Sequence, residues 1–91
     1  MRAVLISYDL NNSGKDYTDV HEYIKGEGTW WHHLESTWIL RTEKPVRQIR
    51  DEIKAAGLDG DDELLVVELK GAAAWTGFSS RGSEWLKKHL S

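Results

Sequence analysis

The feature of this sequence that most constrains its fold is the order in which β-rich segments and amphipathic segments alternate. Four short runs of apolar and β-forming residues are predicted to be strands, and they span residues 3–8, 29–34, 37–41 and 63–69. Two segments carry apolar residues at helical spacings of three and four, and they span residues 16–25 and 46–56. The order strand–helix–strand–strand–helix–strand predicts an α+β protein, a ferredoxin-like βαββαβ sandwich with an antiparallel sheet of four strands and both helices on one face.

Polar residues, a proline and two glycines mark the ends of the predicted helices. Asn12 or Ser13, in the polar loop after the first strand, is predicted to accept a backbone N–H at the start of the first helix. Pro45 suits the first turn of the second helix, because a backbone N–H has no partner there in any case. Gly26 and Gly57 are expected to end the two helices.

Residues 71–91 are predicted to form a C-terminal extension of a core made by residues 1–70, within a single domain. A crossing segment rich in glycine and alanine leads from the last strand to a short helix predicted over residues 83–90. Because both other helices lie on one face of the sheet, its second face needs a cover, and we expect the partner subunit of a homodimer to supply it. Trp75 and Phe78, the large apolar residues of the crossing segment, are therefore predicted to make dimer contacts.

Composition excludes several classes of function. The chain has 91 residues with 12 Lys and Arg against 15 Asp and Glu, and its formal net charge of −3 disfavours strong non-specific nucleic-acid binding. The absence of cysteine excludes disulfides, thiolate metal sites and a cysteine nucleophile. No apolar run approaches the roughly 20 residues of a membrane span. No signal-peptide pattern is present, so we expect a cytoplasmic protein with no membrane partner.

Three short segments carry a resemblance to a known family. They are the first strand, which ends in Tyr8 and Asp9, the Ser-Thr-Trp-Ile strand that starts at Ser36, and the acidic turn and apolar strand of residues 61–67. In these segments the chain resembles the small CRISPR-associated nuclease subunit, which is the second Cas protein, and the related virulence-associated protein D toxins. The likeness spans roughly residues 1–70 of the chain.

A group of bacterial proteins labelled SinR-like resembles the chain more closely, through residues 6–10 and the Trp-Trp-His of residues 30–32. That label implies transcriptional regulation. The sequence contains no helix-turn-helix pattern, so we do not carry this function over.

The resemblance to the CRISPR-associated subunit implies a twofold dimer in which the Asp at the end of the first strand approaches its symmetry mate. It implies that Asp9 is a metal ligand and catalytic residue, that Mg²⁺ or Mn²⁺ is the cofactor, and that the activity is endonucleolytic cleavage of RNA or DNA. This chemistry is physically reasonable, since a hard cation prefers carboxylate oxygens and stabilises the oxygens of a reacting phosphate. One Asp in each chain becomes a carboxylate pair by symmetry.

Two alternatives stay open from the residues themselves. Asp9 at a strand end can simply cap a turn through its side chain. The protein can then be a catalytically silent dimer that binds a protein partner or acts as a scaffold, which the negative net charge favours. A third reading, a domain of the same fold that senses a small molecule, has no ligand motif to support it.

The second predicted helix carries a basic stripe that is a candidate for nucleic-acid contact. Arg47, Arg50 and Lys54 lie at spacings of three and seven residues, which places them along one side of a helix. An ordinary ion pair between Arg47 and Asp51, four residues apart, is the competing interpretation.

Adjacent aromatic and histidine residues in the second strand are predicted to face in opposite directions. Because strand side chains alternate, His32 and His33 cannot bind one ion as a local pair, and their roles stay open. Alternation likewise predicts that one of Trp30 and Trp31 faces the helices and the other faces the open side of the sheet.

Overall fold

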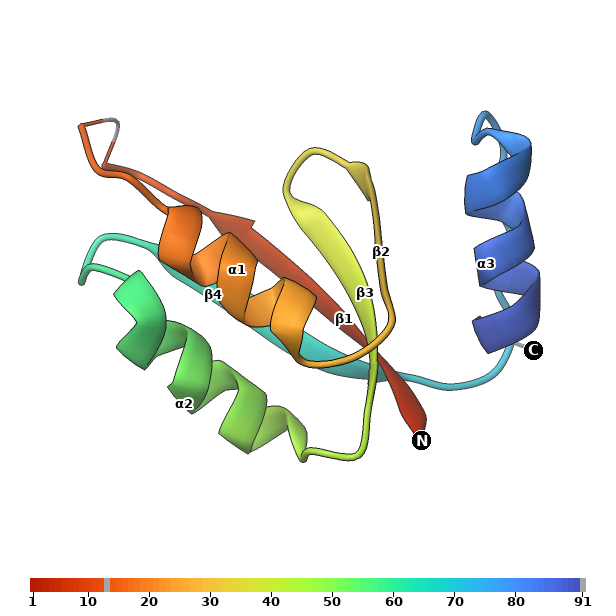
Figure 1. The fold of residues 1–91 in the computed structure, drawn as a ribbon, viewed down its shortest axis with the longest axis horizontal. Helices are drawn as coiled ribbons and strands as arrows, with labels where there is room; N and C mark the ends of the chain where they lie inside the picture. Colours follow the sequence, from red (N-terminus) through yellow and green to blue (C-terminus); the bar gives the residue numbers. More distant parts are fainter. Residues whose placement is uncertain (13, 91) are drawn as a thin grey trace.

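The computed structural model describes residues 1–12 and 14–90, and the elements of this part follow one another along the chain as in Figure 1. They are β1 (Arg2–Asp9), α1 (Thr18–Gly26), β2 (Trp30–Leu34), β3 (Thr37–Thr42), α2 (Val46–Gly57), β4 (Glu63–Leu69) and α3 (Ser80–Leu90).

The strands form one antiparallel sheet in the order β2-β3-β1-β4. The apolar strand β1 lies inside the sheet, where it pairs with β3 from Arg2 to Ser7 and with β4 from Ala3 to Asp9. The pairing of β2 with β3 is less regular, because its register shifts between Trp31 and Leu34. The predicted α+β class and the antiparallel sheet of four strands are confirmed.

The main core lies between the sheet and the helices α1 and α2, which run beside each other across one face of the sheet (Figure 1). Alternate residues of the strands point to this face and the apolar stripes of the two helices meet them, as the sequence spacing predicts. The buried residues of this core are Val4, Ile6, Val20, Ile24, Trp38, Leu40, Ile49 and Ile53.

The C-terminal extension covers part of the second face of the same sheet. Leu86 of α3 packs on Ala3, Trp31 and Ile39 in a second buried cluster. The indole N–H of Trp31 donates a hydrogen bond to the carbonyl of Gly82 at 3.2 Å, which fixes α3 over β2. The expectation of a second face left wholly to a partner subunit is therefore wrong, because the chain itself covers the half that holds Trp31.

The two large residues of the crossing segment take part in this intramolecular cluster. The ring of Phe78 lies edge-on to Trp31 with 4.9 Å between centroids, and Trp75 is partly buried in the same cluster. Part of their apolar surface is therefore already buried within the chain. Their contact with a second subunit stays a prediction. The helix that follows begins at Ser80, three residues before its predicted start.

The other half of the second face is uncovered and apolar. The register places Leu5 opposite Val67 and Ser7 opposite Leu65, and these residues alternate with the core residues of β1 and β4. The exposed fractions are 56% for Leu65 and 38% for Val67. We call Leu5, Leu65 and Val67 the open apolar face.

The loop between β1 and α1 differs from its prediction. Helix α1 begins at Thr18, whose backbone N–H donates to a carboxylate oxygen of Asp16 at 2.9 Å. The Asn12 side chain instead donates to Asp59 and accepts from the N–H of Gly14, so Asn12 does not cap the helix. Ser13, the other predicted cap, lies outside the described residues.

Within residues 1–12 and 14–90, none of the helices has the length and apolar character needed to cross a membrane.

Candidate functional site

Asp9 lies at the end of β1 where a second carboxylate stands opposite it. The β1–β4 register pairs Asp9 with Glu63, and both side chains are exposed. Strand alternation puts them on the same side as Leu5 and Ser7, which is the side of the open apolar face. Residues directly opposite in an antiparallel pair have Cβ atoms about 4.5–5.5 Å apart, and like charges there repel each other. A cation beside this pair would remove that repulsion.

The carboxylate of Asp9 is not used in the turn that follows it. Within the part of the chain that the structure describes, this carboxylate accepts no hydrogen bond and forms no ion pair. The backbone carbonyl of Asp9 is bonded instead, by the side-chain amide of Asn11 at 3.3 Å, and the same amide donates to the carbonyl of Asp61 at 2.6 Å. The side chain that stabilises this turn is therefore Asn11 and not Asp9, to which the alternative interpretation assigned the role.

A second carboxylate, that of Asp62, holds the surrounding loops in place. It accepts the backbone N–H of Asn11 and that of Asp59, both at 2.8 Å, and the hydroxyl of Tyr17 lies 2.8 and 2.9 Å from its two oxygens. These bonds join the segment after β1 to the turn before β4. They therefore fix the ends of the two strands that carry Asp9 and Glu63.

The hydrogen bonds of Asp62 also make its contribution to stability depend on pH. Burial alone raises the pKa of this carboxyl, but the N–H groups of Asp59 and Asn11 and the hydroxyl of Tyr17 outweigh burial and hold the pKa below the ordinary value of 3.8. A carboxyl whose pKa is lower in the folded than in the unfolded chain stabilises the fold above its unfolded value. This stabilisation disappears as the pH falls through the folded value.

We therefore expect Asp62→Asn to lower the urea midpoint at pH 7 and to have progressively less effect as the pH falls below about 4. An asparagine side chain has one oxygen acceptor where the carboxylate has two. Some of the groups that donate hydrogen bonds to Asp62 would therefore face an N–H group and lose their acceptor. The matched control is Asp61→Asn, an exposed carboxyl in the same turn. A decrease in the urea midpoint of Asp62→Asn that is as large at pH 3 as at pH 7 would contradict this account.

One subunit offers two carboxylates to a metal ion at this end of the sheet. Among residues 1–12 and 14–90, no group of three or more His, Cys, Asp or Glu is placed to hold one. Asp9 and Glu63 offer two carboxylates, whereas hard cations such as Mg²⁺ take six oxygen ligands that include water. Water would fill the remaining positions around a cation held by this pair, and the same residues of a second copy would add two more carboxylates.

The basic stripe of α2 lies away from Asp9. Helix α2 packs on the sheet face opposite to the one that carries Asp9, and Arg47, Arg50 and Lys54 are exposed on it. The predicted pair of Arg47 with Asp51 is replaced by Arg50, whose Nε and Nη2 each lie 2.9 Å from the Asp51 carboxylate. The structure does not bring these cations and Asp9 into one site.

Two histidines form a cluster with Tyr8 that the sequence did not reveal. The buried indole of Trp38 donates to the Tyr8 hydroxyl oxygen at 2.9 Å, which leaves the hydroxyl hydrogen for Nε2 of His21 at 3.2 Å. Burial lowers the pKa of His21, and the nearby His32 lowers it further, which suits a neutral ring that accepts this bond. The ring of His32 stacks on Trp38 with 3.8 Å between centroids.

His32 thus packs against Trp38 on the face of the sheet that carries α1 and α2. His33 lies on the other side, against Trp31 and Gly82 below α3, so the predicted opposite orientation of the two histidines is confirmed. The same alternation is seen in Trp30, whose ring contacts Trp38, and in the buried Trp31.

Comparison of the chain with protein-family models, with curated proteins and with solved structures found no match.

Proposed function

We propose that this protein is a ferredoxin-like homodimer in which Asp9 of both subunits holds Mg²⁺ or Mn²⁺ for endonucleolytic cleavage of RNA or DNA. The order β2-β3-β1-β4, with antiparallel neighbours and with α1 and α2 on one face, supports the ferredoxin-like assignment. The single observation that carries the functional proposal is the exposed carboxylate of Asp9, which has no partner in the described chain and faces Glu63 across the sheet.

The open apolar face supports the twofold contact. Leu5, Leu65 and Val67 lie on the same side of the sheet as Asp9, and α3 leaves them uncovered. Burial of exposed leucine and valine side chains stabilises association by about 25 cal/mol per Å² of apolar surface removed from water. A twofold axis through this face would make the contact self-complementary, and an axis close to its Asp9 end would bring the two Asp9 residues toward each other.

The donor set suits a hard divalent cation. Asp9 and Glu63 of two subunits supply four carboxylates, and carboxylate oxygen is the ligand that Mg²⁺ and Mn²⁺ prefer. When bound, such a cation supplies a Lewis acid that polarises a phosphate oxygen and lowers the pKa of a water molecule. The chain's own contribution is to fix the two strand ends through Asp62 and to keep the Asp9 carboxylate free of competing bonds.

The second candidate is the catalytically silent dimer that binds a protein partner. The observation in its favour is the charge around Asp9, because Asp59, Asp61, Asp62 and Glu63 surround this end of the sheet while the basic stripe of α2 lies on the other face. A polyanionic substrate is repelled by such a surface unless cations neutralise it.

The test measures mass and cleavage on the same preparation. Light scattering at micromolar concentration is expected to give a dimer, and single-stranded RNA or duplex DNA is expected to be cut with Mg²⁺ or Mn²⁺ but not with EDTA. A monomer contradicts the shared site, and cleavage in EDTA contradicts the role of the metal. A dimer that cuts neither substrate supports the silent module.

A further inference from the structure

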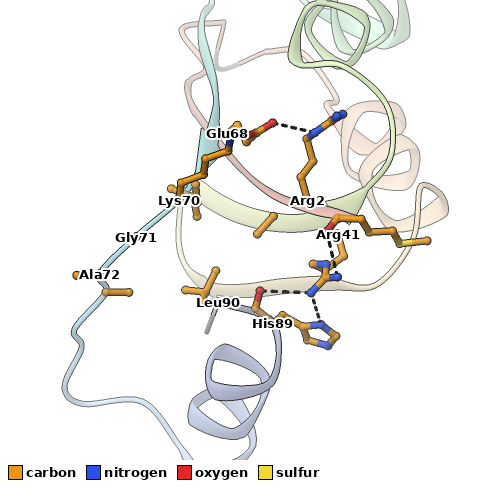
Figure 2. Close-up of a pocket in the computed structure, with 12 residues that line it drawn as sticks. Arg2, Arg41, Glu68, Lys70, Gly71, Ala72, His89 and Leu90 are labelled. Carbon is orange, nitrogen blue, oxygen red and sulfur yellow. Dashed lines mark hydrogen bonds and ion pairs between the residues drawn. The ribbon is translucent and has the colours of Figure 1, made fainter.

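A second concave site lies at the other end of β1 from Asp9. It is a cavity of about 600 Å³, within the range of about 300–1,000 Å³ that small-molecule sites occupy. Figure 2 shows how four parts of the chain surround it. Arg41 of β3 lies near His89 and Leu90 at the end of α3, Arg2 lies at the start of β1, and the chain from Glu68 to Ala72 runs along the opposite side.

The guanidinium of Arg41 uses one of its sides to hold α3. Its Nη1 donates to Nδ1 of His89 at 3.2 Å and to the carbonyl oxygen of the same residue at 3.3 Å, which satisfies a carbonyl at the C-terminal end of the helix (Figure 2). Its Nη2 donates to the carbonyl of Met1 at 3.2 Å. The helix is thus held by one nitrogen of the guanidinium.

Nε is the nitrogen of Arg41 that these bonds leave without an acceptor. It is buried and has no hydrogen-bond partner among the described residues. A buried donor without an acceptor is rare in folded proteins and is destabilising. Nε lies on the same edge of the planar guanidinium as Nη2, and this edge is the fork that recognises the two oxygens of a carboxylate or phosphate. Met1, whose carbonyl accepts from Nη2, lines the cavity and is 77% exposed, so a ligand on this edge would have to displace it.

The charges of the cavity favour an anion. Arg2, Arg41 and Lys70 are its three cationic side chains, and Glu68 is its one acidic side chain, so the lining carries 3 − 1 = +2 in a protein whose net charge is −3. Glu68 is shared between Arg2, at 2.8 Å, and Lys70, at 3.1 Å. The Lys70 side chain is 83% exposed and is therefore free to turn toward a bound anion.

The rest of the lining is apolar and made of small residues. Leu69 and Leu90 contribute to it, and Gly71, Ala72 and Ala73 form one side without long side chains. Pockets of this composition, with an apolar wall and a few polar groups that fix orientation, are typical of sites for small organic ligands. An inorganic anion would use only the cationic part.

We propose that this cavity binds a small organic anion, with its carboxylate or phosphate on the Nε and Nη2 edge of Arg41 and its apolar body against the alanine wall. This function is separate from the metal site at Asp9, and each can fail without the other. It is also distinct from the capping of α3, because the cap uses Nη1 and does not explain the unpaired Nε–H.

The test is an NMR titration of the whole ¹⁵N-labelled chain with benzoate, phenyl phosphate, inorganic phosphate and benzyl alcohol. Benzoate or phenyl phosphate is expected to shift the Nε–H signal of Arg41 and the amide signals of Ala72 and Ala73. Inorganic phosphate is expected to bind several-fold more weakly and benzyl alcohol not at all. Absence of these shifts at a ligand concentration of roughly 10 mM, which is ten times a Kd of 1 mM, would overturn the proposal. Shifts equal for phenyl phosphate and inorganic phosphate would also overturn it, since the apolar wall would then contribute nothing.

Variants separate the ligand role of Arg41 from its structural one. Arg41→Lys keeps the charge but loses the planar fork, and affinity is expected to fall about tenfold to a hundredfold. Should Arg41→Lys unfold, Lys70→Glu decides, because it changes an exposed side chain and is expected to weaken binding about threefold to tenfold through charge alone. Arg81→Glu, the same change of charge at an exposed position near the start of α3, is the matched control. Equal losses in Arg81→Glu and Lys70→Glu would contradict a local site.

Discussion

Asp9→Asn is expected to abolish metal-dependent cleavage while leaving the fold unchanged. The substitution keeps the size of the side chain and removes the charge that holds the cation, so the rate falls by orders of magnitude. The free energy of unfolding is expected to change by less than about 0.5 kcal/mol, because the Asp9 carboxylate has no partner among the described residues. The measurement is cleavage of RNA and duplex DNA with Mg²⁺ or Mn²⁺, alongside a urea denaturation curve for each protein.

Two further variants make this result specific. Glu63→Gln is expected to weaken metal binding, so that cleavage needs a higher metal concentration, since Glu63 is the cross-strand partner of Asp9. Asp61→Asn removes an equal charge from the same acidic end and is expected to cut as the wild type does. Cleavage by Asp9→Asn at the wild-type rate would end the proposed mechanism, and equal losses in all three variants would indicate a general effect of charge.

Leu65→Lys is expected to convert the proposed dimer into a monomer. Leu65 is 56% exposed on the open apolar face, and a lysine there would be buried in the proposed twofold contact. Two like charges that lose water on association are strongly unfavourable. The subunit itself tolerates the change because the side chain is exposed before association. Light scattering at micromolar concentration is expected to give half the wild-type mass, and cleavage is expected to be lost with the dimer.

The control for this variant is Ala55→Lys, which adds the same charge to an exposed position of α2 on the other side of the molecule. It is expected to leave the dimer intact. An unchanged mass for Leu65→Lys would show that the subunits meet elsewhere, and the loss of the dimer in both variants would show that net charge rather than this face controls association.

Most of the secondary structure follows from local patterns. The spacing of Val20 and Ile24 is enough to predict α1, and the apolar run that ends at Leu69 is enough to predict β4, because each signal lies within a few neighbouring residues. The path of the C-terminal extension is not encoded locally. Its packing depends on Trp31 and Ile39, which are far away in sequence and become its neighbours only when the sheet has formed.

The candidate sites divide in the same way. Asp9 can be picked out from the sequence because a strand end is a local feature, but Glu63 becomes its partner only through the β1–β4 register. The cavity around Arg41 could not be predicted, since it joins the start of β1, the end of β4 and the end of α3. Tyr17 has a helical spacing to Val20, yet it precedes α1, and its hydroxyl donates a hydrogen bond to the Asp62 carboxylate.

The irregular pairing of β2 has a consequence for how the sheet can grow. Both β2 and β4 are edge strands, but β2 has five residues and its register is interrupted, whereas β4 has seven residues paired without a break. Short and bulged edges resist the addition of further strands, and long regular edges accept them. We therefore expect any edge-to-edge aggregation of this protein at high concentration to begin at β4, and a proline whose missing N–H falls on the outer side of β4 is expected to block it.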